Sequence, residues 1–416
     1  MIPLSKNHTL NIAYLTSRYP AISHTFILRE VRSLRNQGLF INVASINNPD
    51  RPLQQLTQEE KEEANNTYFV KNHGIKGALS THLTMLIHHP KHYLSGFLLS
   101  LRLGGLNLPK LKLCILYFVE AIMIGQWMKK TQSKHLHVHF ASQAATVGMI
   151  TKQIFPISLS YTVHGPDEFY DVSVHSLKEK IKYADFIICI GYFSRSQMMK
   201  LSDYKYWNKL EIAPLGVDPL LFAPVTQENE NDETEIICVG RLTPAKGQHI
   251  LISAIKQLAD KEKNIKLRII GDGPDRRSLE KQVKQFNLQD NIIFEGAVNQ
   301  DKIRQLYAKA DIFVLASFAE GIPVVLMEAM AMEIPCISTN ITGTPELIRN
   351  DIDGILVPAS DETKLADAIE SLIDNATLRI KLGKAGRQRV IEKYNLDPNI
   401  DRLAKIFLKR LYPTKN

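Results

Sequence analysis

The stretch EIICVGRLTPAKGQHILISAI, residues 235–255, changes its hydrophobic pattern halfway along its length. It begins with a near-continuous apolar run, turns at Gly240-Arg241 and Lys246-Gly247, and continues with the apolar spacing of a helix. Strands that are covered on both faces of a parallel sheet need continuous apolar runs of this kind. The stretch therefore predicts a strand, a glycine-bearing turn and a helix, which together form one unit of a parallel α/β sheet.

The same alternation recurs on both sides of this stretch. Further apolar runs that favour strands begin at residues 11, 41, 137, 158, 185, 266, 291, 311 and 335. The pattern predicts an α/β chain of two Rossmann-like, doubly wound domains that face each other across a cleft, with ligands at the carboxyl ends of the strands. The polar, acidic residues 223–235 are predicted to link a first domain, 1–222, to a second, 236–395. Residues 396–416 are predicted to form a helix that packs back on the first domain.

Composition narrows the class of protein. The chain has 416 residues, of which 44% are hydrophobic and 23% charged, values typical of globular proteins with more than one domain. The start of the chain does not resemble a secretory leader, and four well-separated cysteines in apolar surroundings indicate a reduced, cytoplasmic protein. The apolar run 113–128 is interrupted by Glu120 and Gln126, which favours a buried helix over a membrane span. The net charge of +8 is concentrated in the first half and indicates an anionic partner, a phosphate-bearing ligand or a membrane surface rather than nucleic acid.

Two turns of the second half have the residues that phosphate binding requires. In the quoted stretch, Arg241 and Lys246 flank a turn that leads into a helix, whose free N–H groups attract anions. Arg241 can grip a phosphate with its forked guanidinium and Lys246 can act as a point charge. The alternative is a polar turn with solvated basic residues. A second turn, IIGDGP, contains Gly271, which lets a backbone approach a ligand closely, although such loops are common turns.

The segment EGIPVVLMEAMA, from Glu320, places two carboxylates at the ends of an apolar run. Pro323 is predicted at the first helical position, so that the N–H groups of Val324 and Val325 point out of the helix start. Glu320 and Glu328 can each accept hydrogen bonds from the vicinal hydroxyls of a sugar or a ribose. The alternative makes Glu328 a salt-bridged or half-exposed helix acid and Glu320 a turn residue.

Taken together and in order, GRLTPAKG, IIGDGP, FEGAV, EGIPVVLMEAMA, IPCISTNITGTPELI and DGILVP resemble the second domain of retaining glycosyltransferase family 4. The resemblance covers nearly all of residues 236–395 and extends more loosely into the first domain through VHFA, YTVHGPDEF and APLGVD. It implies a GT-B fold and a hexosyltransferase (EC 2.4) that retains anomeric configuration. It also implies a nucleotide-sugar co-substrate and neither a metal nor another cofactor.

The resemblance also assigns roles to individual residues. Arg241 and Lys246 are expected to hold the donor diphosphate, Glu328 the ribose and Glu320 the donor sugar near its reacting carbon. The residues expected to line the donor site besides these are Gly271, Gly321, Ile322, Pro323, Val324 and Val325. In the first domain, His164 of YTVHGPDEF follows a strand and corresponds to a family histidine that lies close to the donor sugar.

The opening of the chain departs from the commonest family pattern. TSRYPAISHTFILREV has no glycine, and its P-x-x-S-x-TF pattern resembles a subgroup of exopolysaccharide and lipopolysaccharide assembly. Ser23 and Thr25 can cap a helix or contact a ligand, and with Asp167 they are the candidates for the acceptor side. The histidines at 135, 137 and 139 share one strand face, but the matching family strand is usually core, so no metal site is predicted.

The predicted function is transfer of a sugar from a nucleotide-sugar, UDP-linked rather than GDP-linked, to a glycan or lipid-linked acceptor of a cell-surface polysaccharide. The segment 80–105, rich in Leu, aromatic residues, Lys and His, is predicted to be a shielded helical pair or, alternatively, to rest on an anionic membrane. In that case the protein is peripheral to the inner face of the cytoplasmic membrane. The alternative function is a non-catalytic GT-B subunit that activates a partner transferase. The sugar, the base, the acceptor and the oligomeric state are left open.

Overall fold

The computed structural model describes residues 10–172, 175–225 and 233–412 and divides the chain into two compact units. The first unit comprises Met1–Ala213 and Ile400–Asn416, and the second comprises Pro214–Asn399. The division therefore lies upstream of the acidic stretch 223–235 that was predicted as the linker, and residues 214–222 belong to the second unit. Within that stretch, residues 226–232 lie outside the described part of the chain.

The first unit is built on a seven-stranded parallel sheet with the order β3-β2-β1-β4-β5-β6-β7. Its strands are β1 (Asn11–Arg18), β2 (Phe40–Asn47), β3 (Thr67–Phe69), β4 (His135–His139), β5 (Ser158–Val163), β6 (Phe186–Cys189) and β7 (Leu210–Ile212). Its helices are α1 (Thr25–Asn36), α2 (Gln58–Asn65), α3 (Gly74–His88), α4 (Pro90–Gly104), α5 (Leu108–Lys130), α6 (Gln143–Ile154), α7 (Asp167–Tyr170), α8 (Leu177–Tyr183) and α9 (Tyr192–Lys200). Short 3₁₀ turns are η1 (Ile22–His24), η2 (Leu53–Gln55), η3 (Val70–His73) and η4 (Tyr204–Lys209).

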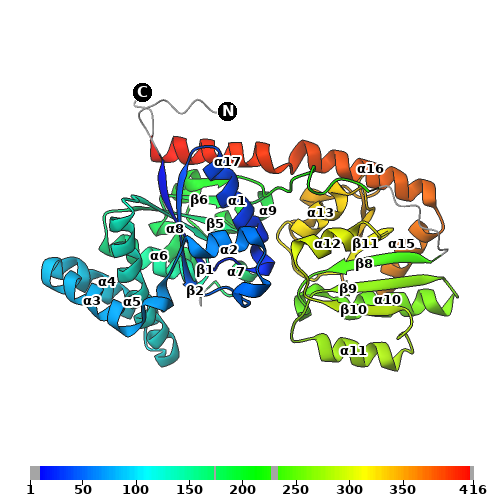
Figure 1. Cartoon of the computed structure of the whole chain (residues 1–416), viewed down its shortest axis with the longest axis horizontal. Helices are drawn as coiled ribbons and strands as arrows, with labels where there is room; N and C mark the ends of the chain where they lie inside the picture. Colours follow the sequence, from blue (N-terminus) through cyan, green and yellow to red (C-terminus); the bar gives the residue numbers. More distant parts are fainter. Residues whose placement is uncertain (1–9, 173–174, 226–232, 413–416) are drawn as a thin grey trace. The chain divides into compact units, whose positions relative to one another are not determined.

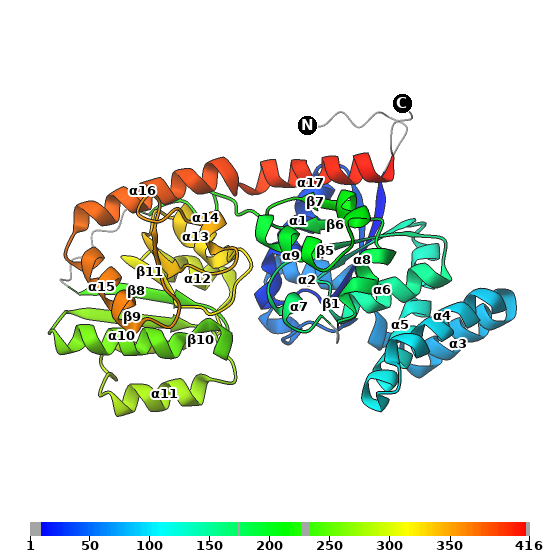
Figure 2. The same cartoon turned by 180° about the vertical axis from the view of Figure 1, so that it is seen from behind.

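The second unit is built on a six-stranded parallel sheet with the order β10-β9-β8-β11-β12-β13. Its strands are β8 (Thr234–Val239), β9 (Ile265–Ile270), β10 (Ile292–Gly296), β11 (Ile312–Leu315), β12 (Cys336–Thr339) and β13 (Ile355–Val357). Its helices are α10 (Gln248–Asp260), α11 (Arg276–Gln285), α12 (Gln300–Tyr307), α13 (Val324–Ala331), α14 (Thr344–Leu347), α15 (Glu362–Ile373) and α16 (Ala376–Lys393), with a 3₁₀ turn η5 (Pro244–Lys246). Figures 1 and 2 show the sheet of each unit with helices packed around it.

These sheets form where the sequence supplies continuous apolar runs. The central strands β4, β5, β6, β11 and β12 are buried along almost their whole length, as strands covered on both faces must be. In each sheet, successive strands are added on one side of the first strand and then on its other side. This switch point lies between β1 and β4 in the first unit and between β8 and β11 in the second. Open α/β sheets bind ligands at the carboxyl ends of the strands beside such a switch point. The fold class predicted from sequence, two Rossmann-like doubly wound domains, is confirmed.

Two helical regions complete the first unit. The helices α3, α4 and α5 pack on one another and extend beyond the sheet of their unit (Figures 1 and 2). The apolar run 113–128 lies in α5, and no helix of the described ranges is long and apolar enough to span a bilayer. From Ile400 onward, the C-terminal helix α17 (Leu396–Leu411) belongs to the first unit, where the ring of Phe407 lies 5.1 Å from that of His137.

Candidate active site

The turn after β8 brings Lys246 to the switch point of the second sheet. Gly247 ends this turn in the left-handed conformation, with φ +61°, and precedes α10. A Cβ at Gly247 would lie 2.1 Å from the carbonyl oxygen of Ala316, at the end of β11, so a side chain there is excluded. The glycine therefore lets the loops after β8 and β11 touch, which is why Lys246 reaches the residues that follow β11.

Lys246 forms an ion pair with Glu320 at the switch point. Nζ of Lys246 lies 2.6 Å from Oε1 of Glu320, and the hydroxyl of Ser317 donates to the same oxygen at 2.6 Å. Glu320 is only 7% exposed, and its backbone carbonyl accepts a hydrogen bond from the hydroxyl of Thr342. A buried carboxylate held by two donors keeps a fixed position, although it still has lone pairs for a further donor.

The nearby glycines serve contacts between loops. Gly271 has φ +135°, and a Cβ there would lie 1.9 Å from the carbonyl oxygen of Gly240. A Cβ at Gly273 would lie 2.2 Å from the carbonyl oxygen of Leu242. A Cβ at Gly343 would lie 2.2 Å from the carbonyl oxygen of Gly321. These close approaches stack the loops after β8 and β9, and those after β11 and β12, against each other. The steric need for glycine at residue 271 is thus explained by the protein's own backbone.

Helix α13 begins one residue later than its sequence predicts. Pro323 was placed at the first helical position, but its ψ of 119° is extended and it occupies the N-cap position, so the helix begins at Val324. The N–H groups of Val324 and Val325 are consequently in the first turn, where helical N–H groups lack intrahelical partners. Ile322, just before the cap, is buried, whereas Gly321 is partly exposed.

Glu328 lies inside the second unit. It is 4% exposed, and the hydroxyl of Tyr307 donates to its Oε2 at 3.2 Å. The alternative of a half-exposed helix acid is therefore wrong. Tyr307, at the end of α12, was not foreseen from the sequence, because a tyrosine among apolar residues gives no sign of which distant carboxylate it meets.

Arg241 behaves differently from Lys246. Its side chain is exposed, and no ion pair or hydrogen bond within the described ranges holds it. Its backbone carbonyl accepts from Nε2 of Gln248 at 3.0 Å, which fixes the turn. The guanidinium is therefore an unengaged cation on the same loop as Lys246, available for an anionic ligand.

In the first unit, His164 directly follows β5, at the carboxyl edge of the sheet; β5 lies next to β4, which borders the switch point. Its ring centroid lies 4.4 Å from that of Phe140 and 4.9 Å from that of Phe26, and the residue is 7% exposed. Burial lowers the pKa of His164 well below 6.5, and the nearby His139 lowers it further. Phe140 adopts φ +66°, which is uncommon for a non-glycine residue. The imidazole is therefore neutral at neutral pH and packed between aromatic rings.

Two buried ionisable side chains that the sequence did not reveal, those of Glu168 and Lys180, hold the backbone around His164. The carboxylate of Glu168 accepts from the N–H groups of Ala141, His164 (2.6 Å) and Gly165 (2.9 Å), while Nζ of Lys180 donates to the carbonyl of Ala141 at 2.8 Å. Burial raises the pKa of Glu168 to about 7 and lowers that of Lys180 to about 7. Both side chains form hydrogen bonds with backbone groups of the loops, and these bonds order the segments after β4 and β5.

The candidates for the acceptor side also lie in the first unit. Ser23 is exposed in η1 and Thr25 is the first residue of α1. Neither caps α1, whose N-cap position is His24 without a side-chain cap. The side chain of Asp167 lies outside the described part of the structure. Their role toward an acceptor stays a prediction.

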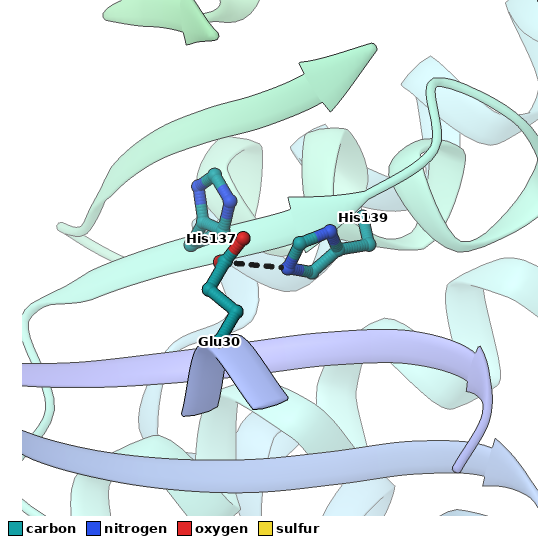
Figure 3. Close-up of side chains that lie close together, drawn as sticks. All are labelled: Glu30, His137 and His139. Carbon is teal, nitrogen blue, oxygen red and sulfur yellow. Dashed lines mark ion pairs between the residues drawn. The ribbon is translucent and has the colours of Figure 1, made fainter. Parts of the chain in front are cut away.

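The histidine stripe of β4 is fully buried, as its core assignment requires. It includes a group that sequence spacing alone did not suggest: ligand atoms of Glu30, His137 and His139 all lie within 4.8 Å of one another (Figure 3). Glu30 comes from α1 and could have been suspected from periodicity. It lies three residues after the buried Ile27 and four before the buried Leu34, on the inner face of the helix.

Comparison with known proteins agrees with this architecture. Residues 224–389 match the family model described as glycosyl transferases group 1. The chain is 30% identical over 291 residues to the uncharacterized glycosyltransferase MJ1178 of Methanocaldococcus jannaschii, covering 68% of this chain and 78% of that protein. It is 24% identical over 398 residues to the putative colanic acid biosynthesis glycosyltransferase WcaL of Escherichia coli strain K12, covering 93% and 96%. It is 25% identical over 424 residues to the amylovoran biosynthesis glycosyltransferase AmsK of Erwinia amylovora, covering 97% and 100%.

Solved structures share the fold along the whole chain. Sucrose-phosphate synthase from Thermosynechococcus elongatus superposes with a TM-score of 0.74 at 19% identity, covering 97% of this chain and 100% of that one. Anabaena HepE in complex with UDP and glucose superposes with a TM-score of 0.71 at 17% identity, covering 96% and 99%. The matched family model, the relatives that match along most of their length and the two doubly wound sheets agree, and the chain belongs to the group 1 glycosyl transferases with a GT-B fold.

Proposed function

We propose that the protein is a retaining hexosyltransferase that takes its sugar from a nucleotide-sugar, and that the Lys246–Glu320 pair marks the donor site. The observation that carries this proposal is the 2.6 Å contact of these two side chains at the switch point of the second sheet. Parallel sheets bind nucleotides at such a place. A cation beside a buried acceptor is what a diphosphate linked to a polyhydroxyl sugar requires.

Different residues at this edge of the sheet bind different parts of the nucleotide-sugar donor. Lys246 and the unengaged Arg241 carry the positive charge that the leaving nucleoside diphosphate needs, and the first N–H groups of α13 add their dipoles. Glu320 accepts from a hydroxyl of the donor sugar and Glu328 from the ribose. As the C1–phosphate bond breaks and the bond from C1 to the acceptor oxygen forms, the acceptor hydroxyl gives its proton to the departing phosphate oxygen, and the remaining negative charge lies beside these cations. We propose that these cations act without a metal ion.

The choice of nucleotide and acceptor rests on the relatives. HepE has been solved with UDP and glucose, which supports a UDP-linked donor over a GDP-linked one. WcaL and AmsK carry the names of colanic acid and amylovoran biosynthesis, which supports a glycan or lipid-linked acceptor of a cell-surface polysaccharide.

A panel of UDP- and GDP-sugars in a thermal-shift assay tests this function. A ligand that binds only the native protein raises the melting temperature, by a free energy that grows as RT ln(1 + [L]/Kd). We expect UDP-sugars to raise Tm more than GDP-sugars, and turnover of the bound donor to require Glu320. A wild-type protein that no nucleotide-sugar stabilises would contradict the proposal and favour a non-catalytic binding subunit.

The acceptor side carries a surface that suits an anionic membrane. On α3, exposed apolar side chains recur at helical spacing on one face: Ile75 (79% exposed), Leu79 (64%), Leu83 (59%), Leu86 (49%) and Ile87 (63%). The sequence from residue 74 to 116 contains five Lys and Arg residues and no Asp or Glu. An apolar stripe among cations is typical of helices that rest on anionic lipid.

We therefore propose that α3 to α5 hold the protein peripherally on the inner face of the cytoplasmic membrane, where lipid-linked acceptors are found. More exposed apolar side chains extend the surface, Leu106 in the turn between α4 and α5 and the others in these two helices: Leu94, Leu98, Leu108, Leu113, Ile115 and Leu116. Of the two alternatives drawn from the sequence, a shielded helical pair leaves these side chains unexplained.

A further inference from the structure

The first two histidines of β4 form a ladder with the hydroxyls of β5. His135 lies opposite Ser158, and its two ring nitrogens contact the hydroxyls of Ser158 (2.8 Å) and Ser160 (2.7 Å). His137 repeats the arrangement one step along, with contacts to Ser160 (2.7 Å) and Thr162 (2.9 Å). Both nitrogens of each ring thus have partners, and burial lowers the pKa of His135 to about 3. These two histidines are structural.

His139 does not follow the ladder. Its Nδ1 lies 3.1 Å from Nε2 of His164, and its Nε2 lies 3.2 Å from Oε1 of Glu30 (Figure 3). The contact with Glu30 is at ion-pair distance but is not aligned as a hydrogen bond. Oε1 of Glu30 also accepts from the hydroxyl of Tyr14 at 2.8 Å, and Tyr14 packs against the His139 ring. Glu30, His139 and His164 therefore form a buried row that joins α1, β4 and the end of β5.

The position of the Glu30 carboxyl group, 3.2 Å from Nε2 of His139, would set the order of the protons along this row if the imidazole is neutral. A bare Nε2 on His139 would direct its lone pair at a carboxylate oxygen, so the adjacent carboxylate favours the tautomer with the proton on Nε2. Nδ1 of His139 is then an acceptor. Since it faces Nε2 of His164, that nitrogen must carry the proton, and in the neutral ring Nδ1 of His164 keeps its lone pair.

Nδ1 of His164 is the open end of the row. Among the described residues it has no hydrogen-bond partner, and His164 is more than nine-tenths buried. A buried nitrogen without a partner is rare in native structures and needs an explanation. A hydroxyl donated by a substrate supplies one.

We propose that Glu30 and His139 are positioning residues that fix the tautomer of His164, so that its Nδ1 accepts a hydrogen bond from a substrate hydroxyl. The proposal rests on the proposed sugar transfer for the identity of that substrate, but the tautomers themselves are independent of it. The arrangement follows the logic of an acid that orients one histidine, extended here through a second ring.

A bound metal is the competing explanation for the cluster in Figure 3. Glu30, His137 and His139 are residue types that bind zinc. Both nitrogens of His137 already contact hydroxyls, however, and Nδ1 of His139 contacts His164. The metal content of the purified protein, measured by mass spectrometry, distinguishes the two explanations.

The test is ¹⁵N NMR of selectively labelled histidines in the full-length protein. His164→Gln and His139→Gln assign the two rings. In the wild type we expect both rings with the proton on Nε2, and in Glu30→Gln we expect the Nδ1-protonated form of His164 to appear. The control is Glu63→Gln, because Glu63 is another buried carboxylate that accepts from a tyrosine hydroxyl, that of Tyr19 at 2.9 Å. Glu63 pairs with Arg35 at 2.6 Å and, among the described residues, contacts no histidine.

Kinetics provide the second readout. Glu30→Gln is expected to lower kcat/KM about tenfold, the equivalent of one substrate hydrogen bond, whereas Glu63→Gln is expected to leave the tautomers unchanged. A wild-type His164 protonated on Nδ1, an equal tautomer change in both variants, or one equivalent of metal that Glu30→Gln loses would each overturn the proposal. The wild-type spectrum decides even if Glu30→Gln does not fold. Absence of transferase activity with correct tautomers would overturn the proposed function instead.

Discussion

Lys246 and Glu320, which are 74 residues apart in sequence, meet with Nζ and Oε1 at 2.6 Å on the carboxyl edge of the second sheet. Glu320 is buried and Lys246 retains a fifth of its side-chain exposure. The lysine is thus close enough to hold the carboxylate and exposed enough to meet a ligand. The charge of Lys246 contributes both to the stability of the fold and to the proposed sugar transfer, and substitutions can separate these two contributions.

Substitution of the pair is expected to separate stability from activity. Lys246→Met leaves the buried carboxylate of Glu320 with Ser317 but without its cation, and should lower the free energy of unfolding by about 1–3 kcal/mol. Lys246→Met combined with Glu320→Gln should recover most of that loss, because no unpaired charge remains, yet sugar transfer should stay abolished. Denaturant unfolding and donor turnover measure the two effects. Transfer that recovers together with stability would contradict the assigned roles.

Gly247 is expected to be irreplaceable in the donor loop. Gly247→Ala combines an unfavourable left-handed conformation with a contact of 2.1 Å to the carbonyl of Ala316, and should destabilise the protein by about 2–4 kcal/mol. Gly240→Ala, on the same loop, is the control, because the nearest atom to its Cβ would be Cδ of Lys246 at 3.7 Å, an ordinary van der Waals distance. Melting temperatures of the two variants provide the comparison. Equal losses would show that the close approach of the two loops is not what requires glycine.

Phe407 is expected to contribute strongly to the stability of the first unit. Its ring is fully buried and lies 5.1 Å from His137 and 6.0 Å from His135 and Phe186. Phe407→Ala should cost about 3–5 kcal/mol, whereas the exposed Lys405→Ala, on the same helix, should cost less than about 0.5 kcal/mol. Calorimetric melting of both variants tests this. A Phe407→Ala protein as stable as the control would contradict the packing of α17 on the first unit.

Acid is expected to destabilise the protein through its buried neutral histidines. Burial lowers the pKa of His135 to about 3, so between pH 6.5 and 3 the unfolded chain binds a proton that the folded chain does not. Stability therefore falls as the pH falls, by up to about 1.4 kcal/mol per pH unit for each such histidine. His135→Gln should show a smaller drop in Tm between pH 7.5 and 5.5 than the wild type. Identical drops would show that His135 does not contribute.

The apolar stripe of α3 is expected to bind anionic lipid. Leu79→Ser with Leu83→Ser should reduce sedimentation with phosphatidylglycerol vesicles at low salt without lowering Tm, because both side chains are exposed. The control pair is Leu220→Ser with Val225→Ser, which are exposed apolar residues of the second unit. A wild-type protein that does not sediment with these vesicles, or an equal loss in both pairs, would contradict the membrane surface.

The sequence predicted those features that depend on local pattern. The apolar runs around β8 and β11 identified the strands, and the glycine before α10 identified the turn, because a buried strand and a left-handed residue restrict the local residue type. The order of the strands then follows from topology rules, which place β8 next to β11. The contact between Lys246 and Glu320, which follow these two strands, could therefore be predicted. Pro323 was misplaced by one residue, since its fixed φ suits both the N-cap and the first helical position.

The remaining features depend on which distant residues meet. The partner of Glu328 is a tyrosine of another helix, and the three backbone contacts of Glu168 exist only once β4 and β5 are paired. The stripe of β4 was recognised as core, but its third histidine differs from the first two through its contacts with Glu30 of α1 and with His164. No local pattern encodes such contacts, although a carboxylate on the inner face of a helix signals that one exists.

The account's central claim, that Lys246 holds the diphosphate of a nucleotide-sugar, is tested most directly by calorimetric titration of UDP into three proteins. These are the wild type, the double variant Lys246→Met/Glu320→Gln, and Lys266→Ala, which removes a lysine of β9 that is bonded to the carbonyl of Asp290. We predict that the wild type and Lys266→Ala bind UDP equally, and that the double variant binds it about tenfold more weakly or not at all. UDP binding that is equal in all three proteins, or absent from the wild type, would contradict the claim.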